Sequence, residues 1–133
     1  MDWLIAGIFA AALAWAFNTW TANWGGSLSL IILVPLIEET AKTGLVWLIG
    51  GSLVLSHAVF GLVEAVYEMR RDKQPGAAAM AITLHLVFGL VTLGLLRYSG
   101  SWVVAVIGAS ALHALWNLLI IRFFTRWAGG KIS

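Results

Sequence analysis

The stretch LVPLIEETAKTGLVWLIG, residues 33–50, determines how the rest of the chain has to be interpreted. It is apolar enough to be a membrane-spanning helix, yet Glu38, Glu39 and Lys42 stand near its middle. An ionised side chain at the centre of a bilayer costs at least about 2.5–3.5 kcal/mol. Three such side chains so close together therefore need partners, a chemical role, or both.

The composition of the whole chain is that of an integral membrane protein. Of its 133 residues, 61% are hydrophobic and only 11% are charged, and the mean hydropathy is +0.93. A soluble domain of this size has too little interior to hide so much apolar surface. The net charge of +2 is small, so nucleic acid is not an expected partner. The lack of cysteine excludes disulfides and thiol nucleophiles.

The lengths of the apolar runs predict five membrane spans. A helix needs about 20 apolar residues to cross the hydrocarbon core of a bilayer. The expected spans are, in order, about 3–20, 28–49, 53–69, 77–96 and 102–123. We therefore expect an all-α fold, a polytopic transmembrane helical bundle of about five spans that forms a single domain over residues 1–133.

The basic residues predict the orientation of these spans. With five spans, the loop after the third span and the C-terminus lie on the same side of the membrane. That side holds Arg70, Arg71, Lys73, Arg122, Arg126 and Lys131. The opposite side holds only Arg97 among the loop residues. The positive-inside rule then places the N-terminus outside and the C-terminus in the cytoplasm.

Polar side chains on four of the expected spans lie at similar depth. With a rise of about 1.5 Å per residue, Glu38 lies about 15 Å from the cytoplasmic end of its helix. His85 and His113 each lie roughly 13 Å in, and Glu64 and Asn117 are somewhat shallower. Acid, imidazole and amide groups thus share one depth, which random placement would not favour.

The spacing of the charges in the second expected span favours internal pairing. Lys42 follows Glu38 by four residues and Glu39 by three, so the lysine can neutralise either carboxylate. Pro35 removes a helix hydrogen bond just before the acidic pair and permits a kink there. Lys42 is therefore expected to be a charge partner, and His57 a buried hydrogen-bonding histidine.

Carboxylates and imidazoles in a low-dielectric cavity are suited to hydrolysis. A carboxylate can act there as a general base on water, and imidazole or carboxamide groups can donate to a developing oxyanion. Two histidines with one or two glutamates also suit zinc with one coordination position left open. No HExxH pair lies on one helix, and no GxSxG elbow is present. A metal site would therefore combine ligands from several helices, and a serine nucleophile is not expected.

The candidate residues follow from this chemistry. The candidate catalytic residues are Glu38, Glu39, Glu64, His85, His113 and Asn117. The candidate ligands of a Zn²⁺ ion are Glu38, Glu64, His85 and His113. A metal-free site, in which a glutamate activates water, stays open beside the zinc hypothesis.

Four short motifs follow one another along the expected spans. EETAK (38–42) matches an EExxK motif, FGLVE (60–64) an FxxxE motif, and HALWN (113–117) an HxxxN motif. His85 is a lone histidine on the span between the last two. In this order they resemble the CAAX-protease and bacteriocin-processing superfamily of intramembrane proteases, specifically its PrsW-like branch. The resemblance covers about residues 28–121.

The resemblance implies a multi-helix membrane core that cleaves peptide bonds near or within the bilayer. It implies a protein of the prokaryotic plasma membrane whose substrate is another membrane protein, such as an anti-sigma factor. By motif, Glu38 resembles the water-activating glutamate, with Glu39 and Lys42 as its supporting pair. His113 and Asn117 resemble the groups that bind the water or the oxyanion.

One position departs from part of that superfamily. The prenyl-protease branch has an FxxxH motif where this chain has Glu64 in FxxxE. This difference argues against prenylated substrates, and it leaves open whether His85 supplies the missing imidazole.

Two other functions stay open beside an intramembrane endopeptidase. One is a non-catalytic membrane scaffold or assembly subunit, because the multipass scaffold subunit of gamma-secretase is similar to this superfamily and uses histidines in assembly. The other is an ion or proton carrier, which intramembrane acids and histidines also suit. The polar residues gather at one depth instead of forming a ladder across the bilayer, which disfavours the carrier. The expected partners are a membrane-protein or peptide substrate, the lipid bilayer and, in an oligomer, further copies of the chain.

Overall fold

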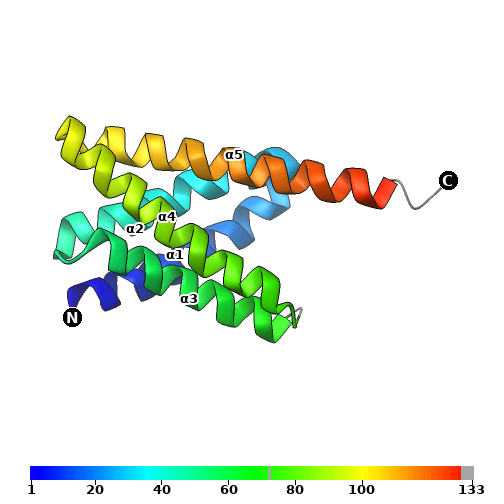
Figure 1. Ribbon diagram of the computed structural model, residues 1–133, viewed down its shortest axis with the longest axis horizontal. Coiled ribbons are helices and arrows are strands. Elements are labelled where there is room, and N and C mark those ends of the chain that lie inside the picture. Colours follow the sequence, from blue (N-terminus) through cyan, green and yellow to red (C-terminus); the bar gives the residue numbers. More distant parts are fainter. Residues whose placement is uncertain (72, 130–133) are drawn as a thin grey trace.

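The computed structural model describes residues 1–71 and 73–129, and its regular elements in these ranges are all helices (Figure 1). They are α1 (Asp2–Leu28), the π-helical turn η1 (Ser29–Leu33), α2 (Val34–Ile49), α3 (Leu53–Arg71), α4 (Pro75–Ser99) and α5 (Trp102–Gly129). The expected all-α fold is confirmed for the described ranges. Lys131, one of the basic residues behind the expected orientation, lies outside them.

Three of the described helices are long and apolar enough to cross a membrane. The qualifying segments are Asp2–Thr21 in α1, Pro75–Ser99 as α4 and Trp102–Phe123 in α5. The other two helices are shorter and more polar, since α2 has 16 residues with the EETAK charges and α3 has 19 residues with four charges in its C-terminal half. The count of five membrane spans therefore stays a prediction.

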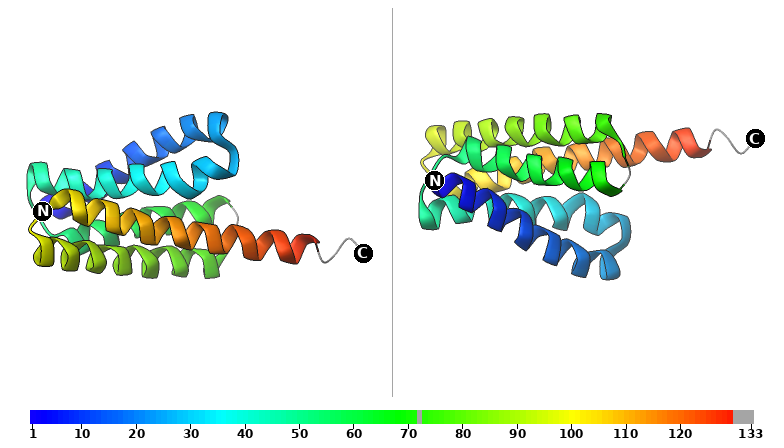
Figure 2. Two further views of the ribbon diagram at one scale, coloured as in Figure 1. Left: turned by 90° about the horizontal axis from the view of Figure 1, so that it is seen from above. Right: turned by 90° about the horizontal axis from the view of Figure 1, so that it is seen from below.

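Consecutive helices run antiparallel along the long axis of the bundle (Figures 1 and 2). The N-terminus, the α2–α3 connection and the α4–α5 connection lie at one end. The turn at η1, the end of α3 with the start of α4, and the end of α5 lie toward the other. This alternation is the arrangement that five successive crossings of a membrane require.

The chain reverses between α1 and α2 without a long loop. Gly26 has φ of 52° and ψ of −143°, a conformation that glycine adopts far more easily than other residues. The expected spans leave residues 21–27 as a connection, whereas the structure has helical backbone on both sides of Gly26 and again through η1. The reversal brings the last turns of α1 beside the start of α2, where the acidic pair lies.

Small side chains let α1 pack closely on the rest of the bundle. Ala6, Ala10 and Ala14 form one stripe of α1 and are at most 1% exposed. On the same helix, a Cβ added at Gly7 would lie 2.6 Å from the Cβ of Val59 in α3. Stripes of small residues allow helix backbones to approach one another in a membrane, where hydrophobic burial gives little drive. The close approach makes α1 one wall of the site described next.

Candidate functional site

The ammonium group of Lys42 lies at the centre of a cluster of buried ionisable side chains. Its Nζ is 2.6 Å from Oε1 of Glu39, 3.0 Å from Nδ1 of His85 and 3.8 Å from Oε2 of Glu38. It also lies 4.2 Å from the centroid of the Phe60 ring, in cation–π contact. The Lys42 side chain is fully buried, so its charge is compensated by these partners alone within the described part of the chain. The spacing of three and four residues in EETAK thus leads to the pairing that it predicts.

Glu39 is saturated by its neighbours. Its Oε1 accepts hydrogen bonds from Lys42 Nζ and from Nδ1 of His113, the latter at 3.2 Å. Its Oε2 lies 3.0 Å from Nε2 of His57. The side chain is fully buried and both oxygens are engaged, so Glu39 has a supporting place in the cluster.

The partners of His85 fix its tautomer. The Lys42 ammonium group can only donate, so Nδ1 of His85 must accept, and the ring proton must be on Nε2. That Nε2–H donates to Oε2 of Glu64 at 2.6 Å. The Glu64 side chain is 40% exposed, so this chain of hydrogen bonds runs from the buried lysine to the surface of a pocket.

The partners of His113 leave its other ring nitrogen open. Because the Glu39 carboxylate accepts, Nδ1 of His113 carries the donated hydrogen. In the neutral imidazole Nε2 then has a free lone pair, and none of the described residues forms a hydrogen bond with it. The Phe88 ring stacks on His113 with centroids 4.6 Å apart and 25° between the planes, which holds the imidazole in place.

Glu38 differs from Glu39 in having one oxygen with no hydrogen-bond partner. Its Oε1 accepts a hydrogen bond from Nδ2 of Asn18 in α1 at 3.0 Å. Its Oε2 is buried, and no described group donates a hydrogen bond to it. That oxygen lies 3.8 Å from Lys42 Nζ and 4.0 Å from His113 Nδ1. Buried polar atoms are normally hydrogen-bonded, and this carboxylate oxygen keeps a lone pair that can accept such a bond.

Two pockets reach this cluster, and Glu64 and Glu68 of α3 line both. The first has a volume of about 540 Å³ between α1 and α3 and reaches Glu38. The second has a volume of about 460 Å³ along α4 and α5 and reaches His85 and His113. Both volumes are within the size range of ligand pockets. The two open groups of the cluster are Oε2 of Glu38 and Nε2 of His113, and these two residues line separate cavities.

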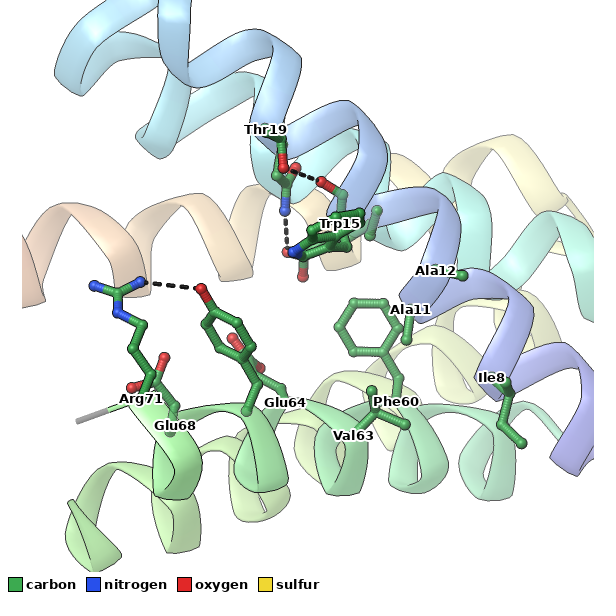
Figure 3. A pocket seen from close by; sticks show the side chains of 14 residues that line it. Ile8, Ala11, Ala12, Trp15, Thr19, Phe60, Val63, Glu64, Glu68 and Arg71 are labelled. Carbon is green, nitrogen blue, oxygen red and sulfur yellow. Dashed lines mark hydrogen bonds between the residues drawn. The ribbon is translucent and has the colours of Figure 1, made fainter. Parts of the chain in front are cut away.

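The first pocket is apolar at one end and charged at the other (Figure 3). Ile8 and Ala12 of α1 lie at the apolar end, across from Val63 of α3. Glu68 and Arg71 lie at the charged end, where Arg71 Nη1 donates to the Tyr67 hydroxyl. A polypeptide segment that is partly apolar and partly polar would match this lining.

Asn117 lies apart from the carboxylates and contacts the backbone. Its Nδ2 donates to the carbonyl oxygen of Leu30 at 2.9 Å. In the π-helical turn η1 each N–H bonds to the carbonyl five residues earlier, as the N–H of Val34 does with the Ser29 carbonyl. The corresponding donor for the Leu30 carbonyl would be Pro35, which has no N–H. The Leu30 carbonyl therefore lacks a backbone donor, and Asn117 supplies one. This contact ties α5 to η1, and Asn117 also lines the second pocket.

The structure brings five of the six predicted site residues into one cluster: Glu38, Glu39, Glu64, His85 and His113. Asn117 lies one helical turn from His113, and its role toward an oxyanion stays a prediction. Asn18 is not among the predicted site residues, because it lies near the end of the first expected span, before the four motifs. The signal that could have found it is an amide side chain next to an apolar span.

The candidate zinc ligands are not gathered around one point in the described part of the chain. Among the described residues, no group of three or more His, Asp and Glu side chains is placed to hold one. The Lys42 ammonium group lies between Glu38 and His85, two of the four expected ligands, and already supplies the positive charge there. The zinc hypothesis stays a prediction, and the chemistry proposed below uses no metal.

No protein-family model, curated protein or solved structure gives a match to this chain. The resemblance to the PrsW-like branch therefore rests on the four sequence motifs. In the fold, residues of all four motifs lie in or beside the cluster around Lys42.

Proposed function

We propose that this chain is an intramembrane endopeptidase that hydrolyses peptide bonds of membrane-associated proteins. The observation that carries the proposal is the free Oε2 of Glu38, a buried carboxylate oxygen without a hydrogen-bond partner among the described residues. A general base needs such a lone pair, and the other buried carboxylate of the cluster, Glu39, has both oxygens engaged.

In this proposal Glu38 activates water. Its Oε2 removes a proton as the water oxygen bonds to the scissile carbonyl carbon, and the resulting carboxylic acid then gives that proton to the leaving amine. By the sequence resemblance His113 binds the water or the oxyanion; it lines the second pocket and Glu38 the first, so this role requires the two cavities to join at the cluster. The products are a carboxylate and an amine, so no other reactant is required.

A donor for the developing oxyanion lies beside the cluster. The amide of Asn117 has two N–H groups and uses one for the Leu30 carbonyl, which leaves the other to donate. Preorganised donors of this kind typically contribute about 10²–10³-fold to the rate of acyl transfer.

We further propose that all five helices cross the membrane, with the N-terminus outside and the C-terminus in the cytoplasm. The alternating connections at the two ends of the bundle support five crossings (Figure 2). Glu68 and Arg71, which line the first pocket, are close to the α3–α4 connection and hence to the cytoplasmic surface. The substrate is then a membrane protein cut in the cytoplasmic half of the bilayer.

A specific observation also favours the scaffold alternative. Glu39, Lys42 and His57 are fully buried and held by one another, and Asn117 braces the η1 backbone. Such a polar core can fix a fold without catalysis. The two functions differ at Glu38: in a scaffold its Oε2 only pairs with the Lys42 charge, whereas in an endopeptidase it also takes a proton from water.

The test compares wild-type protein with Glu38→Gln. Glutamine keeps an oxygen to accept from Asn18 and has nearly the same shape, but it cannot take a proton from water. An endopeptidase of the proposed kind loses cleavage with its fold intact, whereas a scaffold keeps its partners and its fold.

A further inference from the structure

We propose that Asn18 of α1 is a positioning residue for the Glu38 carboxylate, which makes α1 part of the catalytic machinery. This inference rests on the proposed function of Glu38. Asn18 lies outside the motif-bearing residues 28–121, so the sequence resemblance assigns it no role.

The contact that carries the inference joins two helices across the turn at Gly26. Nδ2 of Asn18 donates to Oε1 of Glu38 at 3.0 Å. A carboxylate oxygen can only accept when ionised, so the amide must present its NH₂ group to Glu38. The orientation of the Asn18 amide is thus set by Glu38.

The consequence for Glu38 is that its two oxygens become inequivalent. Oε1 is held by Asn18, while Oε2 has no hydrogen-bond donor among the described residues. A glutamate has several rotatable bonds, and pinning one oxygen directs the other at a fixed point. An oxygen that accepts an N–H is also a weaker base, so proton transfer is directed to Oε2.

The place of Asn18 in the first pocket supports the same role. Asn18 and Glu38 both line this pocket, in which Trp15 and Thr19 of α1 face Phe60 and Glu64 of α3 (Figure 3). Movement of α1 relative to α2 would break the hydrogen bond and release Glu38. Catalytic geometry is therefore coupled to the packing of α1.

The first experiment measures cleavage kinetics with Asn18→Leu, which removes the donor and keeps a similar volume. The substrate is a labelled peptide that carries a cleavage site of the wild-type protein, identified from new protein N-termini in membranes. Ala16→Leu is the matched control, because it places the same residue on the exposed side of the same helix. We expect Asn18→Leu to lower kcat by about tenfold to a hundredfold with KM little changed, as for a misplaced catalytic group.

The second experiment separates positioning from a general structural effect. If Asn18 acts through Glu38, Asn18→Leu causes no further loss of activity in the Glu38→Gln background. An increase in KM without a fall in kcat, or losses that multiply in the double variant, would overturn the positioning role.

The third experiment detects the contact without relying on activity. In protein labelled with ¹⁵N-asparagine, the side-chain amide signal of Asn18 is the one that disappears in Asn18→Leu. We expect Glu38→Leu to shift this signal and Ala16→Leu to leave it in place. An unshifted signal in Glu38→Leu overturns the inference. If Glu38→Leu shifts the signal but the wild-type protein cleaves no peptide bond, the contact is confirmed and the proposed function is overturned instead.

Discussion

Gly61 of α3 lies directly against His85 of α4. A Cβ added at Gly61 would lie 2.9 Å from the Cβ of His85 and 3.0 Å from the carbonyl oxygen of Ala81. Gly89 of α4 faces His57 of α3 in the same way, with an added Cβ 2.9 Å from the histidine Cβ. Each of the two glycines thus makes room for a histidine that contacts the cluster around Lys42.

The first prediction follows from this relationship. Gly61→Ala forces α3 and α4 apart or displaces His85 from Lys42 and Glu64, because the contact is shorter than real Cβ contacts allow. Overpacking of this kind costs about 1–3 kcal/mol, and a displacement of about 1 Å at a catalytic site costs about a hundredfold in rate. Thermal unfolding in detergent and cleavage rate measure the two effects.

The control for this substitution is Gly94→Ala on α4. An added Cβ at Gly94 meets nothing within 4 Å, so the activity should match that of the wild type and the stability should be equal or up to about 1 kcal/mol higher. Equal behaviour of the Gly61 and Gly94 variants would show that the approach of α3 to His85 is not important.

The second prediction concerns the buried lysine. Lys42→Met leaves Glu39 and Glu38 buried without their cation, and removing one partner of a buried ion pair typically destabilises a protein by about 3–5 kcal/mol. We expect a clear fall in the midpoint of thermal unfolding and a loss of cleavage. Lys42→Arg should not restore either property, because the larger guanidinium group does not fit a fully buried ammonium site.

Thr43→Val is the matched control for Lys42→Met. Thr43 is the next residue and is equally buried, and its hydroxyl has no hydrogen-bond partner among the described residues. Removing that hydroxyl should leave stability unchanged or slightly raised. A Lys42→Met protein as stable as Thr43→Val would contradict the ion-pair account.

The third prediction concerns membrane topology. A reporter fused to the C-terminus should give a cytoplasmic signal, and one inserted at Gly50-Gly51 should give an external signal. The physical reason is the excess of basic residues around the α3–α4 connection and the end of α5. A cytoplasmic signal at Gly50 would refute the five-span orientation.

The fourth prediction concerns metal content. The metal-free mechanism, with the Lys42 ammonium group among the expected ligands, predicts far less than one zinc per chain in protein purified without a chelator, whereas the zinc hypothesis predicts about one. Elemental analysis measures this directly. Near-stoichiometric zinc that is lost in His113→Ala would instead support a metal site.

Much of the fold followed from simple rules of length and spacing. The apolar runs predicted the five helices, and the three- and four-residue separations in EETAK predicted that Lys42 pairs with Glu38 and Glu39. These features depend on residues close in sequence. The shared depth of His85 and His113 also predicted their place near the acidic pair.

Features that depend on tertiary packing could not be predicted in this way. Asn18 reaches Glu38 only because the chain reverses at Gly26. Asn117 is drawn to the Leu30 carbonyl because η1 is π-helical, which the position of Pro35 alone does not specify. The tautomers of His85 and His113 likewise depend on partners from other helices, α2 and α3.

The measurement that tests the proposed peptidase activity most directly compares new protein N-termini in membranes that contain wild-type protein or Glu38→Gln at equal amounts. N-terminal labelling and mass spectrometry detect peptide-bond cleavage even when the substrate has not been identified. We expect new N-termini within or next to membrane spans with the wild-type protein, and a fall of about 10²–10⁴-fold with Glu38→Gln, the usual contribution of a general base. The same new N-termini at the same rate with Glu38→Gln, or none with the wild-type protein, would contradict the proposed function.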